Sequence, residues 1–406
     1  MAATERKGRR RKARQRSRTT FRELPWIAAG IGALAARQAR AQSTIDARFL
    51  YYKESGGRTQ VLDPIVLIDQ DLGSTWGRLG LVLGYDAISG ASPSGGYPTA
   101  DVTTSASGQT SSSGNVPLVA YNDHRSSVAL SYGRRFGAHL PSVDLSYAKE
   151  NDYTAKSVGL SDSWTMAGGR GTLHFGASFS RDIVAPVTND LRLPKDTDGY
   201  ALGWTWILGP RDLLDVSASY MRLRGYLDDP YKVVPIGDPG AGTTVPDHRP
   251  DSRARLAFFV KYGHSYTWDG ALKLTYRYYR DDWSARAHTL DAVYDQHAGS
   301  DWIVSPRVRI YTQSAASFYT SLLAAPQEFR SADYRLSSFY SVLGGVSVTR
   351  KIDERLSVNL GATIQSQLGR DRVTPVATSP GAFGASSVSA ADLNVFTLSA
   401  GLTFRY

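Results

Sequence analysis

The sequence predicts an all-β fold, a closed antiparallel transmembrane β-barrel of about sixteen strands with short turns at one end and longer loops at the other. Three observations predict it. Runs of alternating apolar and polar residues recur from residue 43 onward, and most are ten residues or longer. The connections between these runs alternate between short and long. The last run, 393–406, ends in an aromatic residue, which is typical of the terminal strand of such barrels.

The basic charge of the chain is concentrated at its start. The chain holds 47 Lys and Arg against 37 Asp and Glu, a net charge of +10. Residues 1–41 contain twelve of the bases and two of the acids, which leaves 35 of each sign in 42–406. A neutral remainder argues against a nucleic-acid-binding protein, so we expect no nucleic-acid partner.

Residues 1–41 have the layout of a signal peptide with a basic n-region. An apolar stretch at 26–36 follows the basic residues, and Ala39-Arg40-Ala41 is a small-x-small cleavage site. We therefore expect the mature chain to begin at Gln42. The alternative is a disordered basic tail.

The composition fits a membrane protein that lacks transmembrane helices. No run of about twenty apolar residues occurs. The mean hydropathy of −0.29 is that of a soluble protein, but barrel strands give such values because half of each strand faces water. The absence of cysteine excludes disulfides, thiolate metal sites and a cysteine nucleophile.

The expected strands are long enough to cross a bilayer at a tilt, which takes about 9–11 residues. Side chains at i and i+2 share a face of a strand, so each run has one apolar and one polar face. The sixteen candidate strands are 43–53, 59–69, 75–88, 124–136, 140–150, 156–166, 171–183, 199–208, 212–224, 252–267, 271–280, 285–296, 302–313, 334–350, 355–368 and 393–406.

The lengths of the connections provide an independent signal. Bacterial barrels place short turns in the periplasm and longer loops outside, and an even strand count puts both termini at the periplasm. The tight turns are 71–74, 137–139, 167–170, 209–211, 268–270, 298–300 and 351–354. The alternate series holds the long connections 89–123, 184–198, 225–251, 314–333 and 369–392, and three short ones, 54–58, 151–155 and 281–284.

The connection 89–123 is rich in Ser and Gly. Such a segment buries too little apolar area to fold alone. We expect it to be a flexible loop within the barrel domain 42–406, either mobile outside the cell or folded into the lumen.

Charges gather on one face of the strands between 252 and 313. A charge facing lipid at mid-bilayer costs roughly 2–4 kcal/mol, so the charged face is expected to line the lumen and to form cross-strand ion pairs. Two alternatives are open for these charges: a ladder that fixes strand register, or a basic strip that favours anionic solutes. The predicted lumen-lining charges are Lys261, Lys273, Arg277, Asp291, Asp295, Arg307 and Arg309.

The terminal strand is expected to be read by the barrel assembly machinery through strand addition. Its apolar face carries the predicted C-terminal assembly signal, formed by Phe396, Leu398, Leu402, Phe404 and Tyr406. Aromatic residues at other strand ends are candidates for the two interfacial girdles, namely Trp76, Tyr132, Tyr147, Trp164, Tyr220, Tyr266 and Trp302.

No residues are predicted to be catalytic, to bind a cofactor or to bind a metal. The sequence lacks His-Glu-x-x-His, a phosphate-binding loop and a complete calcium loop; Lys195–Gly199 begins like one but lacks the later ligands. His264-Ser265 are adjacent in sequence, but neighbours on a strand point to opposite faces. We therefore expect no enzyme and no cofactor.

Several segments together resemble a family of Gram-negative outer-membrane proteins known only as a domain of unknown function. They are Tyr51–Glu54, Tyr85–Ala91, Gly225–Lys232, Tyr276–Trp283 and Arg309–Ala316. The resemblance covers nearly all of 43–406, without the leader and the Ser-rich loop. It implies a β-barrel of unassigned function, often encoded beside small lipoproteins and flavin-transfer or thioredoxin-like genes. It supplies no catalytic residues.

These observations predict a porin-like channel for small solutes in the outer membrane of a Gram-negative bacterium. The alternative is a plugged or scaffolding barrel that holds a periplasmic or lipoprotein partner of an extracytoplasmic redox system. A hydrolase at the barrel rim is third. The expected partners are outer-membrane lipid, the assembly machinery and a small lipoprotein or periplasmic protein.

Overall fold

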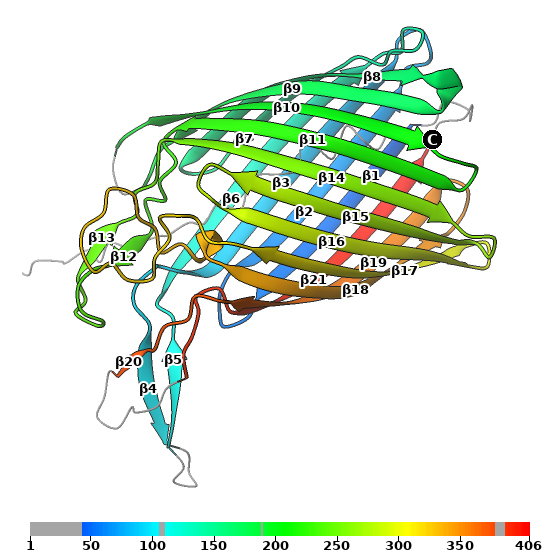
Figure 1. Cartoon of the computed structure of the whole chain (residues 1–406). Helices are drawn as coiled ribbons and strands as arrows, with labels where there is room; N and C mark the ends of the chain where they lie inside the picture. Colours follow the sequence, from blue (N-terminus) through cyan, green and yellow to red (C-terminus); the bar gives the residue numbers. More distant parts are fainter. Residues whose placement is uncertain (1–42, 105–109, 188–189, 378–385) are drawn as a thin grey trace, which may run out of the picture.

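The computed structural model describes residues 43–104, 110–187, 190–377 and 386–406. Sixteen antiparallel strands form one closed barrel (Figure 1). The prediction of a sixteen-stranded closed barrel is confirmed. The expected leader, its cleavage site and Gln42 lie outside the described residues.

Every predicted strand is present, with boundaries that differ by a few residues. In their order around the barrel the strands are β1 (Thr44–Glu54), β2 (Gln60–Asp71), β3 (Arg78–Pro93), β6 (Leu118–Gly133), β7 (Ser142–Lys149), β8 (Tyr153–Met166), β9 (Gly171–Val184), β10 (Leu193–Ile207), β11 (Asp212–Gly225), β14 (Ser252–Ser265), β15 (Gly270–Asp281), β16 (Arg286–Ala298), β17 (Trp302–Gln313), β18 (Phe339–Lys351), β19 (Leu356–Gly369) and β21 (Leu393–Arg405).

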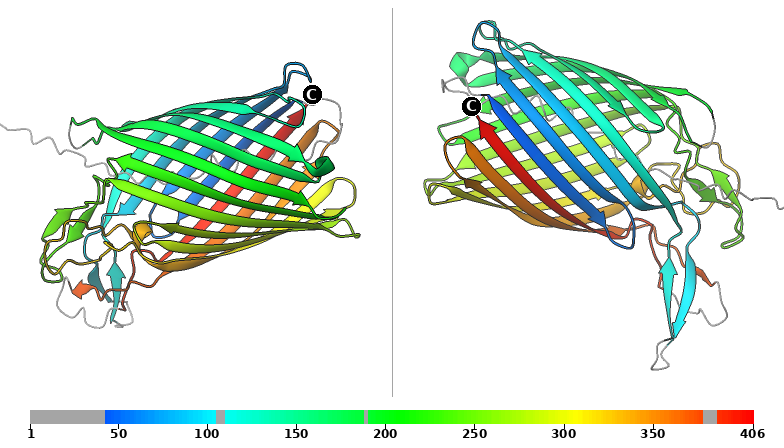
Figure 2. Two further views of the ribbon diagram at one scale, coloured as in Figure 1. Left: turned by 45° about the horizontal axis from the view of Figure 1, so that its top comes forward. Right: turned by 180° about the vertical axis from the view of Figure 1, so that it is seen from behind.

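The barrel closes where the first strand meets the last. β1 pairs antiparallel with β21 from Thr44↔Arg405 to Glu54↔Val395, and the two lie side by side in Figure 2. Closure gives every barrel strand a hydrogen-bonded neighbour on both sides, so the backbone polar groups are paired within the sheet.

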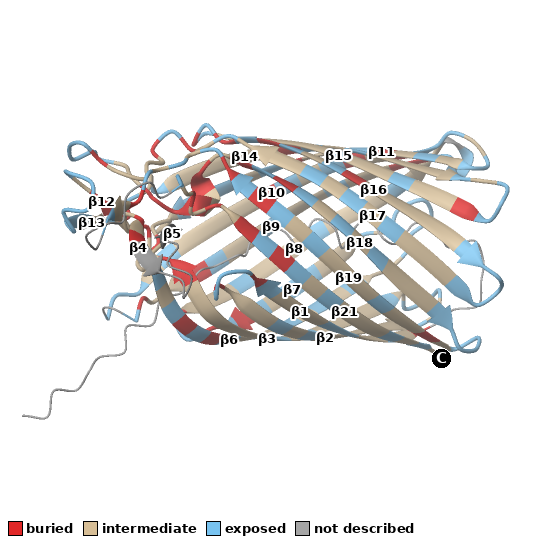
Figure 3. Cartoon of the chain, turned by 90° about the horizontal axis from the view of Figure 1, so that it is seen from below, coloured by how far each residue is buried: buried red, intermediate tan, exposed pale blue. Residues whose placement is uncertain are grey.

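The outer face of the barrel is apolar. On β16 and β17 the cross-strand partners Leu290 and Ile310 are 49% and 50% exposed, and Val308 is 52% exposed. Exposed and less exposed positions alternate along the strands (Figure 3). Asp291 and Arg309 occupy the alternate positions and therefore face the interior. Among the described residues, no helix is long and apolar enough to span a membrane.

The connections alternate in length, as predicted. The short-turn end carries 72–77, 134–141, 167–170, 208–211, 266–269, 299–301 and 352–355. The long-loop end carries 55–59, 94–117, 150–152, 185–192, 226–251, 282–285, 314–338 and 370–392. β1 begins and β21 ends at the short-turn end, while the long loops gather at the other (Figure 1).

The segment 89–123 differs from the predicted loop. β3 continues to Pro93 and β6 begins at Leu118, because residues such as Gly90 and Tyr121 pair across the two strands and satisfy their backbone groups. The remaining 94–117 contains β4 (Thr99–Thr104) and β5 (Thr110–Asn115), an antiparallel hairpin that projects from the long-loop end (Figure 2). β20 (Val376–Ala377) pairs with β4.

Two other boundaries also differ. β10 begins at Leu193, six residues before the predicted 199, because it pairs with β9 up to Val184. Residues 334–336, predicted as strand, form a short 3-10 helix, η2 (Tyr334–Leu336), and β18 begins at Phe339. A small hairpin of β12 (Val233–Pro235) and β13 (Thr244–Pro246) lies within the 226–251 connection.

Candidate functional site

The inner face of β14 to β17 holds all of the predicted lumen charges. Asp291 lies between two arginines of the next strand. It accepts a hydrogen bond from Arg307 Nε at 3.0 Å and one from Arg309 Nε at 2.7 Å. Lys273 Nζ lies 2.5 Å from a carboxylate oxygen of Asp295. The predicted cross-strand ion pairs are therefore present.

The two remaining predicted charges contact other groups. Lys261 Nζ lies 4.0 Å from Asp215 of β11. The Arg277 guanidinium lies over the rings of Phe259 and Tyr279, with distances of 5.5 and 5.2 Å to the ring centroids. Guanidinium groups stack on aromatic faces, so these rings hold Arg277 against the inner face of the barrel. Lys261 is held there by its charge contact with Asp215.

Several of these inward charges are open to solvent. The side chains of Lys273 and Arg309 are 63% and 41% exposed although they point into the barrel. The carboxylate partners of Lys273 and Arg309 lie on a neighbouring strand of the same inner face. The interior at this level therefore has room for water beside the ion pairs.

A serine and a histidine meet inside the barrel near the short-turn end. Ser163 Oγ lies 2.9 Å from His174 Nδ1, and His174 Nε2 lies 3.1 Å from Thr205 Oγ1. Thr205 in turn donates to Asp215 at 2.7 Å. This chain of contacts crosses four neighbouring strands, β8 to β11. All four residues lie within strands, whereas a hydrolase was expected at the barrel rim.

Three buried carboxylates converge near the start of the β7–β8 turn. One oxygen from each of Asp123, Glu150 and Asp152 lies within 4.8 Å of the others. Asn151 Nδ2 donates to Asp123 at 3.0 Å, and Tyr231 donates to Asp152 at 2.5 Å. The contacts within the protein thus account for an arrangement that would otherwise suggest a cation.

The long loops fold together into a loop cap, defined as the described parts of 226–251, 314–338 and 370–392. Buried apolar side chains join the cap to the barrel. Tyr334 packs with Phe339, Leu393 and Val395, against Tyr52 of β1. A second cluster contains Trp283, Ala316, Phe318 and Leu336, and a third contains Val234, Leu323 and Ala332.

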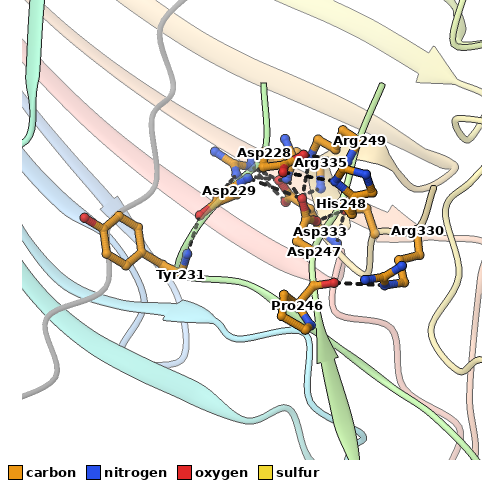
Figure 4. Close-up of polar contacts among 11 residues, drawn as sticks. Asp228, Asp229, Tyr231, Pro246, Asp247, His248, Arg249, Arg330, Asp333 and Arg335 are labelled. Carbon is orange, nitrogen blue, oxygen red and sulfur yellow. Dashed lines mark hydrogen bonds and ion pairs between the residues drawn. The ribbon is translucent and has the colours of Figure 1, made fainter. Parts of the chain in front are cut away.

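A buried ion cluster lies at the centre of the loop cap (Figure 4). Arg335 Nη2 donates to Asp229 Oδ2 at 2.9 Å, and Arg335 also pairs with Asp333. Arg249 donates to Asp247 at 2.7 Å and to Asp333 at 3.1 Å. The three acids and two arginines come from two connections that are far apart in sequence, and this cluster holds those connections together.

Burial and charge act against each other on the titratable groups of this cluster. Burial alone would raise the pKa of Asp333, but Arg335 and Arg249 hold that pKa well below its usual 3.8. Burial raises the pKa of Asp247, and Arg249 only partly offsets it. Burial lowers the pKa of Lys232, with Asp229 and Asp333 acting in the opposite direction. Asp333 is therefore the carboxylate most strongly held in its charged form.

The loop cap reaches across the mouth of the barrel. Lys232, which follows β11, donates to Ser92 Oγ at 2.8 Å and also to the Pro93 carbonyl at the end of β3. β3 and β11 are six places apart in the ring of sixteen strands, so this contact joins nearly opposite parts of the rim. The cap is thus fixed on more than one side.

The loop cap was not predicted from the sequence. Asp229 and Asp333 lie in different connections, and both pair with Arg335, which lies within the short helix η2. The available signal was the number of charges in these loops, nine acids and six bases in all. The predicted assembly-signal residues lie on the outer face; Leu398, Leu402 and Tyr406 are 43%, 47% and 50% exposed. Phe396 and Phe404 are each 38% exposed.

Comparison with known proteins identifies one family. A family model described as "Protein of unknown function (DUF3570)" matches residues 28–195 and 191–384. The match includes part of the expected leader and the segment 89–123, which the resemblance in the sequence did not include. No curated protein matches the chain.

Solved structures resemble the chain in fold. One is a bacterial polysaccharide outer membrane secretin, with 7% identity over 91% of this chain and 100% of that chain and a TM-score of 0.48. The siderophore receptor PirA from Pseudomonas aeruginosa shares 11% identity over 90% of this chain and 62% of its own, with a TM-score of 0.41. An anion-selective porin from Comamonas acidovorans shares 11% identity over 90% and 98%, with a TM-score of 0.36. At these identities nothing about activity follows, and the fold assignment rests on the closed strand order.

Proposed function

Because the chain belongs to the family of proteins of unknown function DUF3570, we propose its function from its geometry: it is an outer-membrane channel for small polar solutes, with the loop cap over its outer mouth. The short-turn end then faces the periplasm of a Gram-negative bacterium, and the long-loop end faces outward.

The apolar outer face supports the membrane location. Large apolar side chains such as Leu360 and Ile364 are 59% and 64% exposed, which in water would leave a wide apolar surface uncovered. Trp164 and Trp302, near the short-turn end, and Tyr147 and Tyr220, nearer the loops, are 39–42% exposed at the two edges of this face. Aromatic girdles at both interfaces are typical of membrane barrels.

One observation carries the channel proposal, namely the exposure of charged side chains inside the barrel. Lys273 and Arg309 point inward and keep 63% and 41% of their side-chain surface exposed. A packed interior would have covered them, whereas a barrel of sixteen strands leaves space for an aqueous lumen.

Recordings from planar bilayers test the proposal. The purified full chain is expected to insert and to give discrete KCl conductance steps. Deleting residues 315–337 of the loop cap should raise the conductance if the cap narrows the path. Heat-modifiable mobility in gels shows whether the chain is folded. A folded chain that inserts in vesicles but never conducts, with or without this deletion, contradicts the channel proposal.

The folded cap favours a second candidate, a plugged barrel that holds a periplasmic or small lipoprotein partner. The ion cluster and the Lys232 contact hold the cap across the mouth. A barrel of this kind would not conduct, and crosslinking in cells would recover a partner beyond the assembly machinery. Recovery of assembly factors alone, together with conductance, would leave the channel as the function.

A further inference from the structure

One sector of the inner face is rich in acids. The inward positions of β1, β2 and β3 are those that alternate with the exposed Phe49, Leu62 and Leu83. They carry two bases, Arg48 and Arg78, against six acids. The acids are Asp46, Glu54, Asp63, Asp69, Asp71 and Asp86. We call this sector the acidic wall.

The sector across the lumen has the opposite charge. On the inward faces of β14 to β17, Arg253 and Arg255 join the five bases already described, against three acids, Asp281, Asp291 and Asp295. We call this sector the basic wall. The ion pairs within it leave bases in excess, because Asp291 serves both Arg307 and Arg309.

The two walls face each other. β2 and β14 are eight places apart in the ring of sixteen strands, which is diametrically opposite. The charges also overlap in depth. Asp69 lies two residues from the short-turn end of β2, and Lys273 lies three residues from the short-turn end of β15. Asp86 and Arg277 lie eight and seven residues from that end of their strands.

The sectors between the walls carry a smaller excess of charge. The inward faces of β6 to β11 hold four acids, Asp123, Asp144, Asp182 and Asp215, against two bases, Arg125 and Lys195. The inward faces of β8 and β9 carry hydroxyl groups, among them Ser157, Ser161 and Ser178. Those of β19 and β21 carry Thr363, Gln365 and Thr397. The net charge of β6 to β11 is therefore −2, against −4 on the acidic wall and +4 on the basic wall, so the charge separation runs mainly along one diameter of the lumen.

We propose that the lumen selects dipolar solutes, small zwitterions that carry an ammonium and a carboxylate group. Opposed charges on facing walls produce a field across the path, strongest where low-dielectric walls confine the water. A zwitterion with its ammonium toward the acidic wall and its carboxylate toward the basic wall is stabilised by both, whereas a simple anion or cation is attracted by one wall and repelled by the other. This inference rests on the proposed channel and names its solute class.

The charged side chains are accessible to such a solute. Asp69 and its partner Arg78 are 46% and 50% exposed on the acidic wall. Lys273 is 63% exposed on the basic wall. Each wall therefore presents charge to the water inside the barrel rather than only to its own ion-pair partners.

Swelling of vesicles that contain the full chain tests the inference. The probes are 4-aminobutyrate, whose charges are well separated, and erythritol, an uncharged solute of similar size. The wild type should admit the zwitterion roughly fivefold faster, which corresponds to about 1 kcal/mol. The pair of changes Asp63→Asn and Asp69→Asn should abolish this preference, and so should Lys273→Gln with Arg277→Gln. Arg224→Gln is the matched control, because Arg224 lies on the outer face and pairs with Asp198.

Reversal potentials in a KCl gradient give a second measurement on the same variants. Neutralising the acidic wall should make the channel anion-selective, neutralising the basic wall should make it cation-selective, and Arg224→Gln should leave selectivity unchanged. Equal entry of both solutes into vesicles that conduct KCl, or wall variants with unaltered reversal potentials, overturns the dipolar inference and leaves the channel standing. A folded, inserted chain without any KCl conductance overturns the channel itself and the inference with it.

Discussion

Arg335 and Asp229 are 106 residues apart in the chain, and the Arg335 guanidinium donates to the Asp229 carboxylate at 2.9 Å. The contact joins the connection after β17 to the connection after β11 within the buried ion cluster. The loop cap is thus held together by charges that come from two different connections.

Replacing Arg335 should loosen the loop cap without unfolding the barrel. Arg335→Met leaves Asp229 and Asp333 without their shared buried cation, and removing one partner from a buried ion pair typically costs about 3–5 kcal/mol. Hydrogen exchange should accelerate in 226–251 and 314–338 while the strand amides stay protected. Arg355→Met, in a short turn at the opposite end, is the control. Unchanged protection of both connections in Arg335→Met would contradict this role.

The loop cap should resist moderate acid. Asp333 has a lowered pKa, and a carboxylate of this kind contributes stability that is fully present above its unfolded pKa and is lost as the pH falls through the folded value. Cap protection should therefore hold down to about pH 4 and decline only below it. Asp247 acts in the opposite direction, because its pKa is raised and its protonation favours the folded form.

The variant Asp333→Asn tests whether Asp333 causes the decline of cap protection below pH 4. It should weaken protection of the cap at neutral pH, because Arg335 and Arg249 lose a charged partner, and it should flatten the decline below pH 4. Asp301→Asn, at a short turn, should keep the wild-type profile. An acid decline of the same size in Asp333→Asn and wild type would assign the effect to other groups.

Asp291→Asn should increase anion selectivity. The change leaves Arg307 and Arg309 without the carboxylate that both contact, so the basic wall gains one net charge. Because these arginines are about two-fifths exposed, water screens them and the loss of stability should be small. The reversal potential in a KCl gradient measures the shift. If the reversal potential does not shift toward the equilibrium potential of chloride, Asp291 and its two arginines serve strand register alone.

Two neighbouring residues of β18 distinguish lipid from lumen. Val346 is 44% exposed on the outer face, and Ser347 points inward opposite Ser305. Val346→Lys should destabilise the barrel in vesicles by roughly 2–4 kcal/mol, whereas Ser347→Lys should cost far less. Urea unfolding monitored by tryptophan fluorescence measures both. Equal losses for the two variants would contradict the assignment of faces.

Period-two alternation was sufficient to locate all sixteen strands because each strand has an apolar outer face and a polar inner face. On β14 and β15, for example, Phe258 and Tyr276 alternate with Lys261 and Arg277. The same alternation gave a wrong strand prediction at one place. Residues 334–336 alternate like a strand, but Tyr334 and Leu336 are buried in two different clusters of the cap and form a short helix.

The loop cap and the charged walls were harder to predict because their partners are distant in sequence. Local pattern placed Arg307 and Arg309 beside Asp291, since adjacent strands are joined by a short turn. It could not place Lys232 against Pro93, or the acidic wall across from the basic one, because those relationships depend on closure of the ring. Which strands face each other across the lumen depends on their order around the barrel and on the number and tilt of the strands.

The seam between β1 and β21 has a consequence for chain connectivity. Thr44 and Arg405 are paired neighbours, and the turn Tyr266–Asp269 departs from the same rim. A covalent bridge across the seam, combined with a break at that turn, would give a circularly permuted polypeptide with the same ring of neighbours. In such a rearranged protein β14 would replace β21 as the terminal strand, so its assembly would separate the requirements of barrel closure from those of the C-terminal signal.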